Sequence, residues 1–156
     1  MDISYKILAN NQNHRFNYRV AAIIEANGLI LISKVIKDDF FFLPGGRVQI
    51  GETTEDALIR EMTEELDVKA TLSGLAFIVE NFFHYEEEAF HELGFFFKVD
   101  GSKLNLPQHE EIREDIQFFW HDANNIEYLN LKPKFLISEL KNMSDIPKHI
   151  VNLGHI

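Results

Sequence analysis

The chain contains no cysteine among its 156 residues. Disulfide bonds, zinc–thiolate sites and cysteine nucleophiles are therefore excluded, and nothing in the sequence requires an oxidising compartment. Residues 1–10 lack the basic start and the long apolar run of a signal peptide, and no stretch reaches the length of a membrane-spanning helix. We therefore expect a cytoplasmic protein without a membrane partner.

Positive charge is also scarce, since 15 Lys and Arg stand against 25 Asp and Glu, a formal net charge of -10. Long nucleic acid is not expected as a partner, because its binding is driven by basic surface. A phosphate-bearing substrate would also be repelled, unless a bound metal ion lay between the phosphate and the protein. The charge balance therefore directs attention to clustered carboxylates.

The remaining composition is that of one globular domain spanning residues 1–156, with 46% hydrophobic and 26% charged residues. Apolar patterning predicts strands, a helix, further strands and a second helix, an order that favours a mixed sheet covered by helices. The tail, residues 144–156, is left open and is expected to pack on the domain or on a second subunit. The predicted strands are residues 16–25, 29–36, 40–43, 69–85, 89–99 and 116–121, and the predicted helices are residues 54–66 and 133–143. Asn27-Gly28 is a tight-turn signal, so the first two strands are expected to form a hairpin. The strands at residues 69–85 and 89–99 are expected to form an antiparallel pair, and residues 108–115 are expected to form a charged loop.

The most informative segment is residues 43–68, LPGGRVQIGETTEDALIREMTEELDV. A Gly-Gly turn is followed by a loop and by a helix that Thr53 is expected to cap. Glu61, Glu64 and Glu65 stand at positions i, i+3 and i+4, which places the three carboxylates along one side of that helix. A bare E-x-x-E-E run is more often a solvated acidic face, so the spacing alone does not establish a site.

Hard divalent cations relieve the repulsion between crowded carboxylates, and ligands that are all oxygen suit Mg²⁺ or Mn²⁺. Arg60 precedes Glu64 by four residues and is expected to hold a carboxylate in position. Glu52, at the end of the loop, is expected to do the same from the other side. The segment is therefore a candidate metal site with its own supporting residues.

The wider spacing resembles the Nudix box of the MutT-like Nudix hydrolases. Gly46 is followed after five residues by Glu52, and after seven more by an Arg-Glu pair, an apolar residue and a Glu-Glu pair. The pattern closes with the apolar Val68. Asp67 departs from it, because the family has Gly there to end the helix in a left-handed conformation, which Asp tolerates better than most residues.

This resemblance implies an α/β/α sandwich with a mixed β-sheet. It also implies a hydrolase that cleaves a phosphoanhydride bond in a nucleoside diphosphate linked to another moiety, with Mg²⁺ or Mn²⁺ as cofactor. The metal ligands carried over are Glu61, Glu64, Glu65 and the carbonyl of Gly45. Arg60 and Glu52 then fix the glutamates, as metal sites require.

Several roles stay open in the sequence. The general base is Glu61 or a carboxylate of the later loop, Glu110 or Glu111, and either of the latter pair could instead be a metal ligand or a surface residue. Arg47 is a candidate phosphate contact, and Glu92 a candidate substrate contact, because alternation lets only one residue of His91–Glu92 face the site.

The alternative function is a non-catalytic ligand-binding or regulatory module that keeps the fold. Such a module would be expected to lose one of the box carboxylates or its arginine, and all are present. The expected partner is a small nucleotide-type molecule. Nucleoside triphosphates, dinucleoside polyphosphates, ADP-ribose and sugar nucleotides all remain open as substrates, and so does a homodimer.

Overall fold

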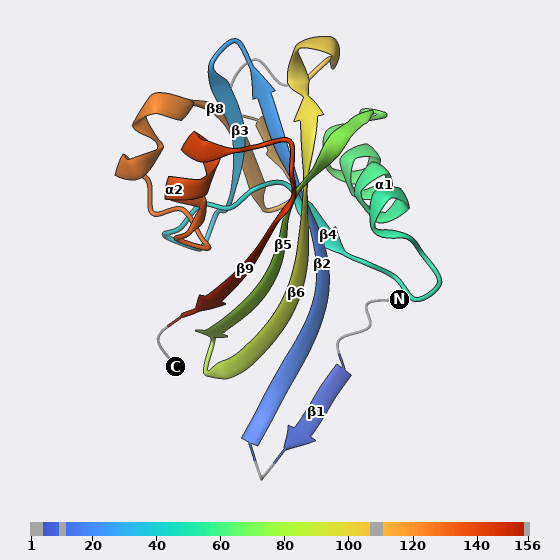
Figure 1. Cartoon of the computed structure of the whole chain (residues 1–156), viewed down its shortest axis with the longest axis vertical. Helices are drawn as coiled ribbons and strands as arrows, with labels where there is room; N and C mark the ends of the chain where they lie inside the picture. Colours follow the sequence, from blue (N-terminus) through green and yellow to red (C-terminus); the bar gives the residue numbers. More distant parts are fainter. Residues whose placement is uncertain (1–4, 10–11, 107–110, 155–156) are drawn as a thin grey trace.

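A computed structural model describes residues 5–9, 12–106 and 111–154. In these residues nine strands form one mixed sheet with helices on both faces (Figure 1), which confirms the predicted α/β class. The elements in chain order are β1 (Tyr5–Ala9), β2 (Gln12–Ala26), β3 (Leu29–Val35), β4 (Gly45–Arg47), α1 (Thr54–Leu66), β5 (Leu72–Tyr85), β6 (Glu88–Asp100), β7 (Glu111–Arg113), β8 (Ile116–Asp122), α2 (Leu136–Glu139) and β9 (Lys148–Leu153). Short 3₁₀ helices lie at Gly101–Lys103, Ala123–Tyr128 and Leu140–Asn142.

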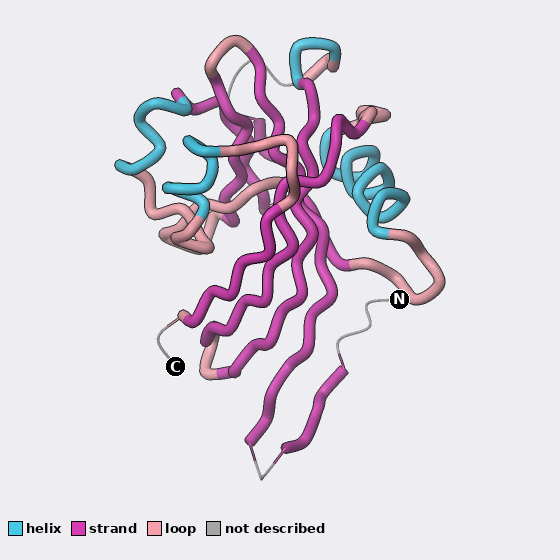
Figure 2. The backbone as a smooth tube through the Cα atoms, viewed as in Figure 1, coloured by secondary structure: helices cyan, strands magenta, loops and turns pink. Residues whose placement is uncertain are grey.

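Strand β2 organises the sheet, whose main order is β7-β8-β3-β2-β6-β5-β9. β2 pairs with β6 in parallel over twelve residues, and β1, β4 and the first residues of β3 pair along its other edge. The other parallel pair is β5 with β9 at the edge of the sheet. Figure 2 shows the long strands β2, β5 and β6 extending together beyond the helices.

Alternation along β2 divides its side chains between two hydrophobic cores. Val20, Ala22 and Ile24 pack in the core that contains the buried residues of α1, so we call this side the α1 face. Ala21 and Ile23 pack on the opposite side, in the core that contains Leu136 of α2, which we call the α2 face. The two cores place helices on both sides of the sheet, as the predicted α/β/α layering requires.

The predicted hairpins are confirmed. Asn27 and Gly28 have φ angles of 53° and 77°, the left-handed conformation at both positions that a tight two-residue turn needs. β5 and β6 form an antiparallel pair from Leu72 opposite Val99 to Tyr85 opposite Glu88. The strand predicted near residue 116 is also confirmed, as β8.

The strand predicted at residues 40–43 is wrong. Phe41 and Phe42 form only isolated bridges. The next strand is β4, which contains the Gly-Gly pair that was expected to form a turn before a loop. Ala22 donates its N–H to the carbonyl of Pro44 at 2.8 Å, which guides the chain alongside β2. A side chain at Gly45 would collide with the β2 backbone at Val20, so only glycine permits this approach.

Differences from the prediction also occur at the C-terminal end. The helix expected over residues 133–143 is shorter: α2 begins only at Leu136, and the chain continues as a 3₁₀ turn to Asn142. Within the loop expected at residues 108–115, Glu111–Arg113 pairs with β8, and residues 108–110 lie outside the described part. In the tail, β9 pairs with β5.

In the part of the chain that the structure describes, no helix combines the length and the apolar character that crossing a bilayer would require.

Candidate active site

Local sequence signals at both ends position helix α1. The Thr53 side chain accepts a hydrogen bond from the Asp56 N–H at 3.1 Å, which caps the first turn as predicted. Asp67 ends the helix with φ 54° and ψ 37°, and its N–H bonds back to the carbonyls of Met62 and Thr63. Asp therefore adopts the left-handed conformation for which the family pattern has Gly.

Packing orients the helix so that its charged residues face the preceding loop. Leu58, Met62 and Leu66 are buried in the core of the α1 face, at the spacing of one helical stripe. Arg60 and Glu61 lie outside that stripe. Burial of the apolar stripe therefore fixes the direction in which the polar side chains of α1 point.

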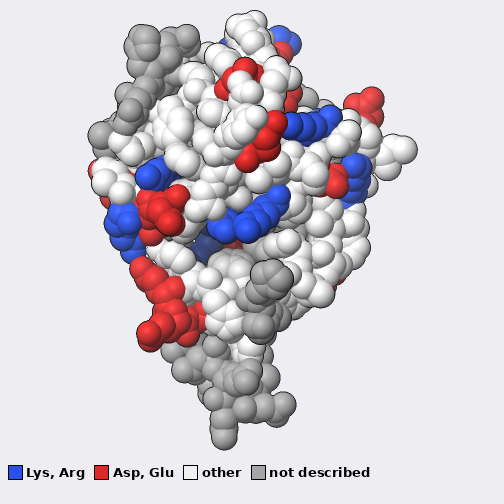
Figure 3. Space-filling view, turned by 90° about the vertical axis from the view of Figure 1, so that its left-hand side faces the viewer, with Lys and Arg blue, Asp and Glu red and all other residues white. Residues whose placement is uncertain are grey.

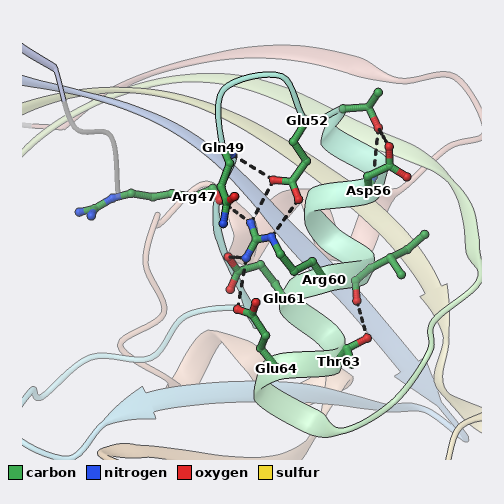
Figure 4. Close-up of polar contacts among 10 residues, drawn as sticks. Arg47, Gln49, Glu52, Asp56, Arg60, Glu61, Thr63 and Glu64 are labelled. Carbon is green, nitrogen blue, oxygen red and sulfur yellow. Dashed lines mark hydrogen bonds and ion pairs between the residues drawn. The ribbon is translucent and has the colours of Figure 1, made fainter. Parts of the chain in front are cut away.

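Arg60 is the centre of the polar network (Figure 4). Its Nε and Nη2 donate to the two oxygens of Glu52 at 2.8 and 3.1 Å, which makes a bidentate ion pair. Its Nη1 donates to Glu61 at 2.7 Å and to Glu64 at 3.2 Å. Nη2 also donates to the backbone carbonyl of Arg47 at 2.9 Å. One guanidinium therefore ties three carboxylates to the loop that precedes the helix.

The members of this network differ in exposure. The side chains of Glu52 and Glu61 are 16% and 14% exposed, whereas that of Glu64 is 59% exposed. The Arg60 guanidinium holds the pKa of Glu52 below its usual value, mainly through its hydrogen bond. The Glu61 carboxylate lies where a side chain at Gly46 would stand, so a larger residue there would displace it. Glu52 and Glu61 are thus fixed, and Glu64 is the accessible carboxylate.

Glu65 lies in a different environment from the other glutamates. Burial raises the pKa of its carboxyl to about 7, and the Gly45 N–H and the positive charge of Arg19 only partly oppose that shift. The negative charges of Glu61 and Glu64 raise the pKa further. An enclosed carboxyl that resists ionisation is a group whose negative charge an additional nearby cation would stabilise.

The raised pKa of Glu65 predicts a pH-dependent stability in chelator. Because the folded chain binds this proton more tightly than the unfolded chain, the stabilisation is complete below about pH 4.5 and is lost as the pH rises through about 7. After allowance for solvent screening, we expect the free energy of unfolding of the wild type to fall over that pH range by about 2 kcal/mol more than that of Glu65→Gln. Urea unfolding at pH 4.5 and 7.5 measures the difference, and Glu55→Gln, an exposed change on the same helix, controls for net charge. Equal pH dependence in wild type and Glu65→Gln would contradict the prediction.

The donor set fits a hard divalent cation. All candidate ligands are oxygens, and three carboxylates lie within little more than one helical turn. Among the described residues, no three acidic or histidine side chains are already gathered at metal-ligand distances, because Glu61 and Glu64 are turned toward the Arg60 guanidinium. Glu64 is exposed and held by one 3.2 Å contact, so it is free to change rotamer.

The other predicted residues are not part of this network. Arg47 contributes only its carbonyl to the network, and its side chain extends away from the glutamates (Figure 4). Glu92 lies on the α2 face, and its described hydrogen bonds are with Asn17 and Asn81. Glu110 lies outside the described residues, and only the backbone of Glu111, in β7, is described.

The sequence prediction did not include Arg19. This residue lies in the middle of β2, opposite Arg47 of β4, and its charge acts on the carboxyl of Glu65. Arg19 is the single Lys or Arg of the strand predicted at residues 16–25, and this signal could have identified it, because a half-buried charge needs a partner.

Comparisons with known proteins place most of the chain in one family. The model of the NUDIX domain family matches residues 15–139. An uncharacterized Nudix hydrolase of Bacillus subtilis, YvcI, is 27% identical over 116 residues, which cover 71% of this chain and 69% of that protein.

Solved structures share the fold at lower identity. The mutator MutT protein of Bacillus halodurans has a TM-score of 0.68 at 16% identity, covering 85% of this chain and 89% of that chain. The ORF135 protein of E. coli has a TM-score of 0.54 at 24% identity, covering 81% and 86%. At these identities the likeness establishes the fold alone.

The structure thus combines a mixed sheet that has helices on both faces with an arginine-centred glutamate cluster on a capped helix. The family match covers most of the chain, and the chain belongs to the NUDIX domain family. It is a Nudix pyrophosphohydrolase, an enzyme that hydrolyses pyrophosphate bonds in small molecules.

Proposed function

We propose that the chain is a divalent-metal-dependent hydrolase that cleaves the pyrophosphate bond of a nucleoside diphosphate linked to another moiety. The observation that carries the proposal is the set of carboxylates assembled around Arg60, beside an enclosed Glu65 whose pKa is raised to about 7. The network orders the acidic side chains, and Glu65 lacks sufficient positive charge around it. Mg²⁺ or Mn²⁺ would supply that charge.

Glu61, Glu64, Glu65 and the carbonyl of Gly45 would hold the metal. Once bound, the metal would neutralise phosphate oxygens and lower the pKa of a bound water. Gly45 adjoins this set because its N–H already donates to the carboxylate of Glu65. Oxygen ligands on one helix and on the loop before it would leave the open side of the site to the substrate.

The residues around the ligands have positioning roles in this proposal. Arg60 fixes Glu61, and Glu52 holds Arg60 from the opposite side through a bidentate ion pair. The general base is a carboxylate, either Glu61 or one of Glu110 and Glu111. Glu61 is the candidate whose side chain the structure describes, and its other oxygen is not used by Arg60.

Two arginines fit the phosphates of an anionic substrate on a chain with a net charge of -10. The charge of Arg19 acts on Glu65, and its guanidinium lies 5.9 Å from the centre of the Phe42 ring. Arg47 follows the Gly-Gly pair directly, with its side chain directed away from the glutamates.

The test is a substrate panel of nucleoside triphosphates, dinucleoside polyphosphates, ADP-ribose and sugar nucleotides, incubated with Mg²⁺, with Mn²⁺ and with EDTA. Products separated by anion exchange should show metal-dependent release of a nucleoside monophosphate from one class. Equal turnover in EDTA would contradict the metal requirement. A folded chain that binds these compounds but cleaves none of them would instead support the non-catalytic module.

A further inference from the structure

A row of polar side chains crosses four strands on the α2 face, and all but the half-buried Asn152 are buried. Asn17 of β2, Glu92 of β6, Asn81 of β5 and Asn152 of β9 stand at paired positions in neighbouring strands. Asn152 Nδ2 donates to Asn81 Oδ1 at 2.7 Å, and Asn81 Nδ2 donates to Glu92 Oε1 at 3.3 Å. Asn17 Nδ2 donates to Glu92 Oε2 at 3.5 Å. The two amides flanking Glu92 therefore both direct donors at its carboxylate.

This row leaves hydrogen-bond acceptors without adequate partners. Glu92 is only 7% exposed, yet its two bonds exceed the usual length, and no described lysine, arginine or histidine forms an ion pair with it. Asn17 is 6% exposed, and its Oδ1 is buried with no hydrogen-bond partner. A buried carboxylate and a buried amide oxygen are costly to leave in this state. The atoms that lack adequate partners are therefore all hydrogen-bond acceptors, and only a hydrogen-bond donor could satisfy them.

The row adjoins the candidate active site. Asn17 precedes Arg19 by two residues on the same strand and the same face, a separation of about 7 Å. The charge of Arg19 acts on Glu65 of the glutamate site. A substrate whose phosphates lie at Arg19 would therefore extend toward Asn17 and Glu92 with its other end.

Aromatic side chains of one loop lie across this part of the face. We call residues 37–42, between β3 and β4, the aromatic loop. The ring of Phe42 lies under Arg19, and Phe40 contacts both Phe42 and Tyr85 of β5, with ring centres 6.4 and 6.1 Å apart. The loop thus reaches from β2 to β5, the strands that flank Glu92. Figure 3 shows that this side of the molecule is hollowed near its middle, between basic and acidic side chains.

We propose that Glu92, together with Asn17 Oδ1, selects the base of the substrate by accepting hydrogen bonds from two adjacent N–H donors, and that the aromatic loop packs on the plane of that base. Guanine presents such an edge, with a ring N–H beside an amino group. Adenine places a ring acceptor beside its amino group, which a carboxylate repels. A ribose diol also offers two donors, but it has no flat face for Phe40 or Phe42. The inference rests on the proposed function, because it assumes a nucleotide substrate.

Binding of nucleoside monophosphates to the full chain in EDTA tests the inference without requiring catalysis. We expect GMP to bind about tenfold or more tightly than IMP, which lacks the amino group, and than AMP. Deoxy-GMP should match GMP. In Glu92→Gln the ratio of GMP to IMP affinity should fall below about threefold. Glu80→Gln, a carboxylate of β5 that pairs with His149 instead, is the matched control and should keep the preference.

Equal binding of GMP, IMP and AMP would overturn the inference, and so would a preference that survives in Glu92→Gln. A preference for ribose over deoxyribose without base discrimination would assign the donors to the sugar and would also overturn it. If Glu92→Gln does not fold, Asn17→Ala removes the other acceptor and should reduce the preference about threefold. Nucleotide turnover without base preference would leave the proposed function standing, whereas guanine-selective binding without turnover would leave only the present inference.

Discussion

Replacing Glu64 by Gln is expected to lower kcat about a hundredfold or more and to leave stability unchanged. A neutral amide is a poor ligand for Mg²⁺, and a bound metal contributes several kcal/mol to stabilising the transition state of such a reaction. Glu64 is 59% exposed and contacts Arg60 at 3.2 Å, so its loss should shift the free energy of unfolding by no more than about 0.5 kcal/mol. Steady-state kinetics and urea unfolding measure the two effects separately.

Glu55→Gln is the matched control for this change. Glu55 is exposed in the first turn of the same helix and makes no contact with Arg60, so the charge change is the same and the candidate ligand set is intact. We expect wild-type kinetics from that variant. Full activity of Glu64→Gln with Mg²⁺ would remove Glu64 from the metal site, and a large loss of stability would show that its role is structural.

Replacing Arg60 by Gln is expected to damage stability and activity together. The substitution leaves the mostly buried carboxylates of Glu52 and Glu61 without their cation, which costs about 2–4 kcal/mol. Because the freed carboxylates lose their fixed positions, the affinity for Mn²⁺ should also fall about 10- to 100-fold. Thermal unfolding and titration with Mn²⁺ measure the two losses.

Arg60→Lys separates charge from geometry. Lysine keeps the positive charge, but it cannot form the bidentate ion pair with Glu52 while also reaching Glu61 and the carbonyl of Arg47. Its stability should lie between those of wild type and Arg60→Gln, with metal affinity still reduced. Lys103→Gln, which removes a lysine whose side chain is 82% exposed, controls for the lost charge. Wild-type metal affinity in Arg60→Gln would show that the network does not position the ligands.

The candidate site could be predicted where it depends on neighbours in sequence. Arg60, Glu61 and Glu64 share one helix, and the spacing of a helix determines which of its side chains meet. Thr53 and Asp67 end that helix as expected, for the same reason. The role of each glutamate in catalysis stays a prediction. The proximity of Arg19 to Glu65 could not be predicted in this way, because it depends on the pairing of β2 with β4.

The fold shows the same division between local and distant contacts. The Asn27–Gly28 turn and the β5–β6 hairpin follow from adjacent residues, and both were predicted. β9 is a short alternating run that becomes a strand only by pairing with β5, about 70 residues earlier in the chain. β4 forms only because glycine allows close approach to β2. Propensity alone carries no information on such partners.

The long parallel pairing of β2 with β6 also has a consequence for the order of folding. Asn17 and Glu92 are 75 residues apart in the chain, so closing that loop has a high entropic cost and parallel contacts of this separation form slowly. Helix α1 and the β5–β6 hairpin depend on nearby residues and can form first. We therefore expect the glutamates of α1 to reach a native-like arrangement before the strand that brings Arg19 to them has docked. Pulse-labelling hydrogen exchange during refolding should then protect the amides of α1 earlier than those of β2.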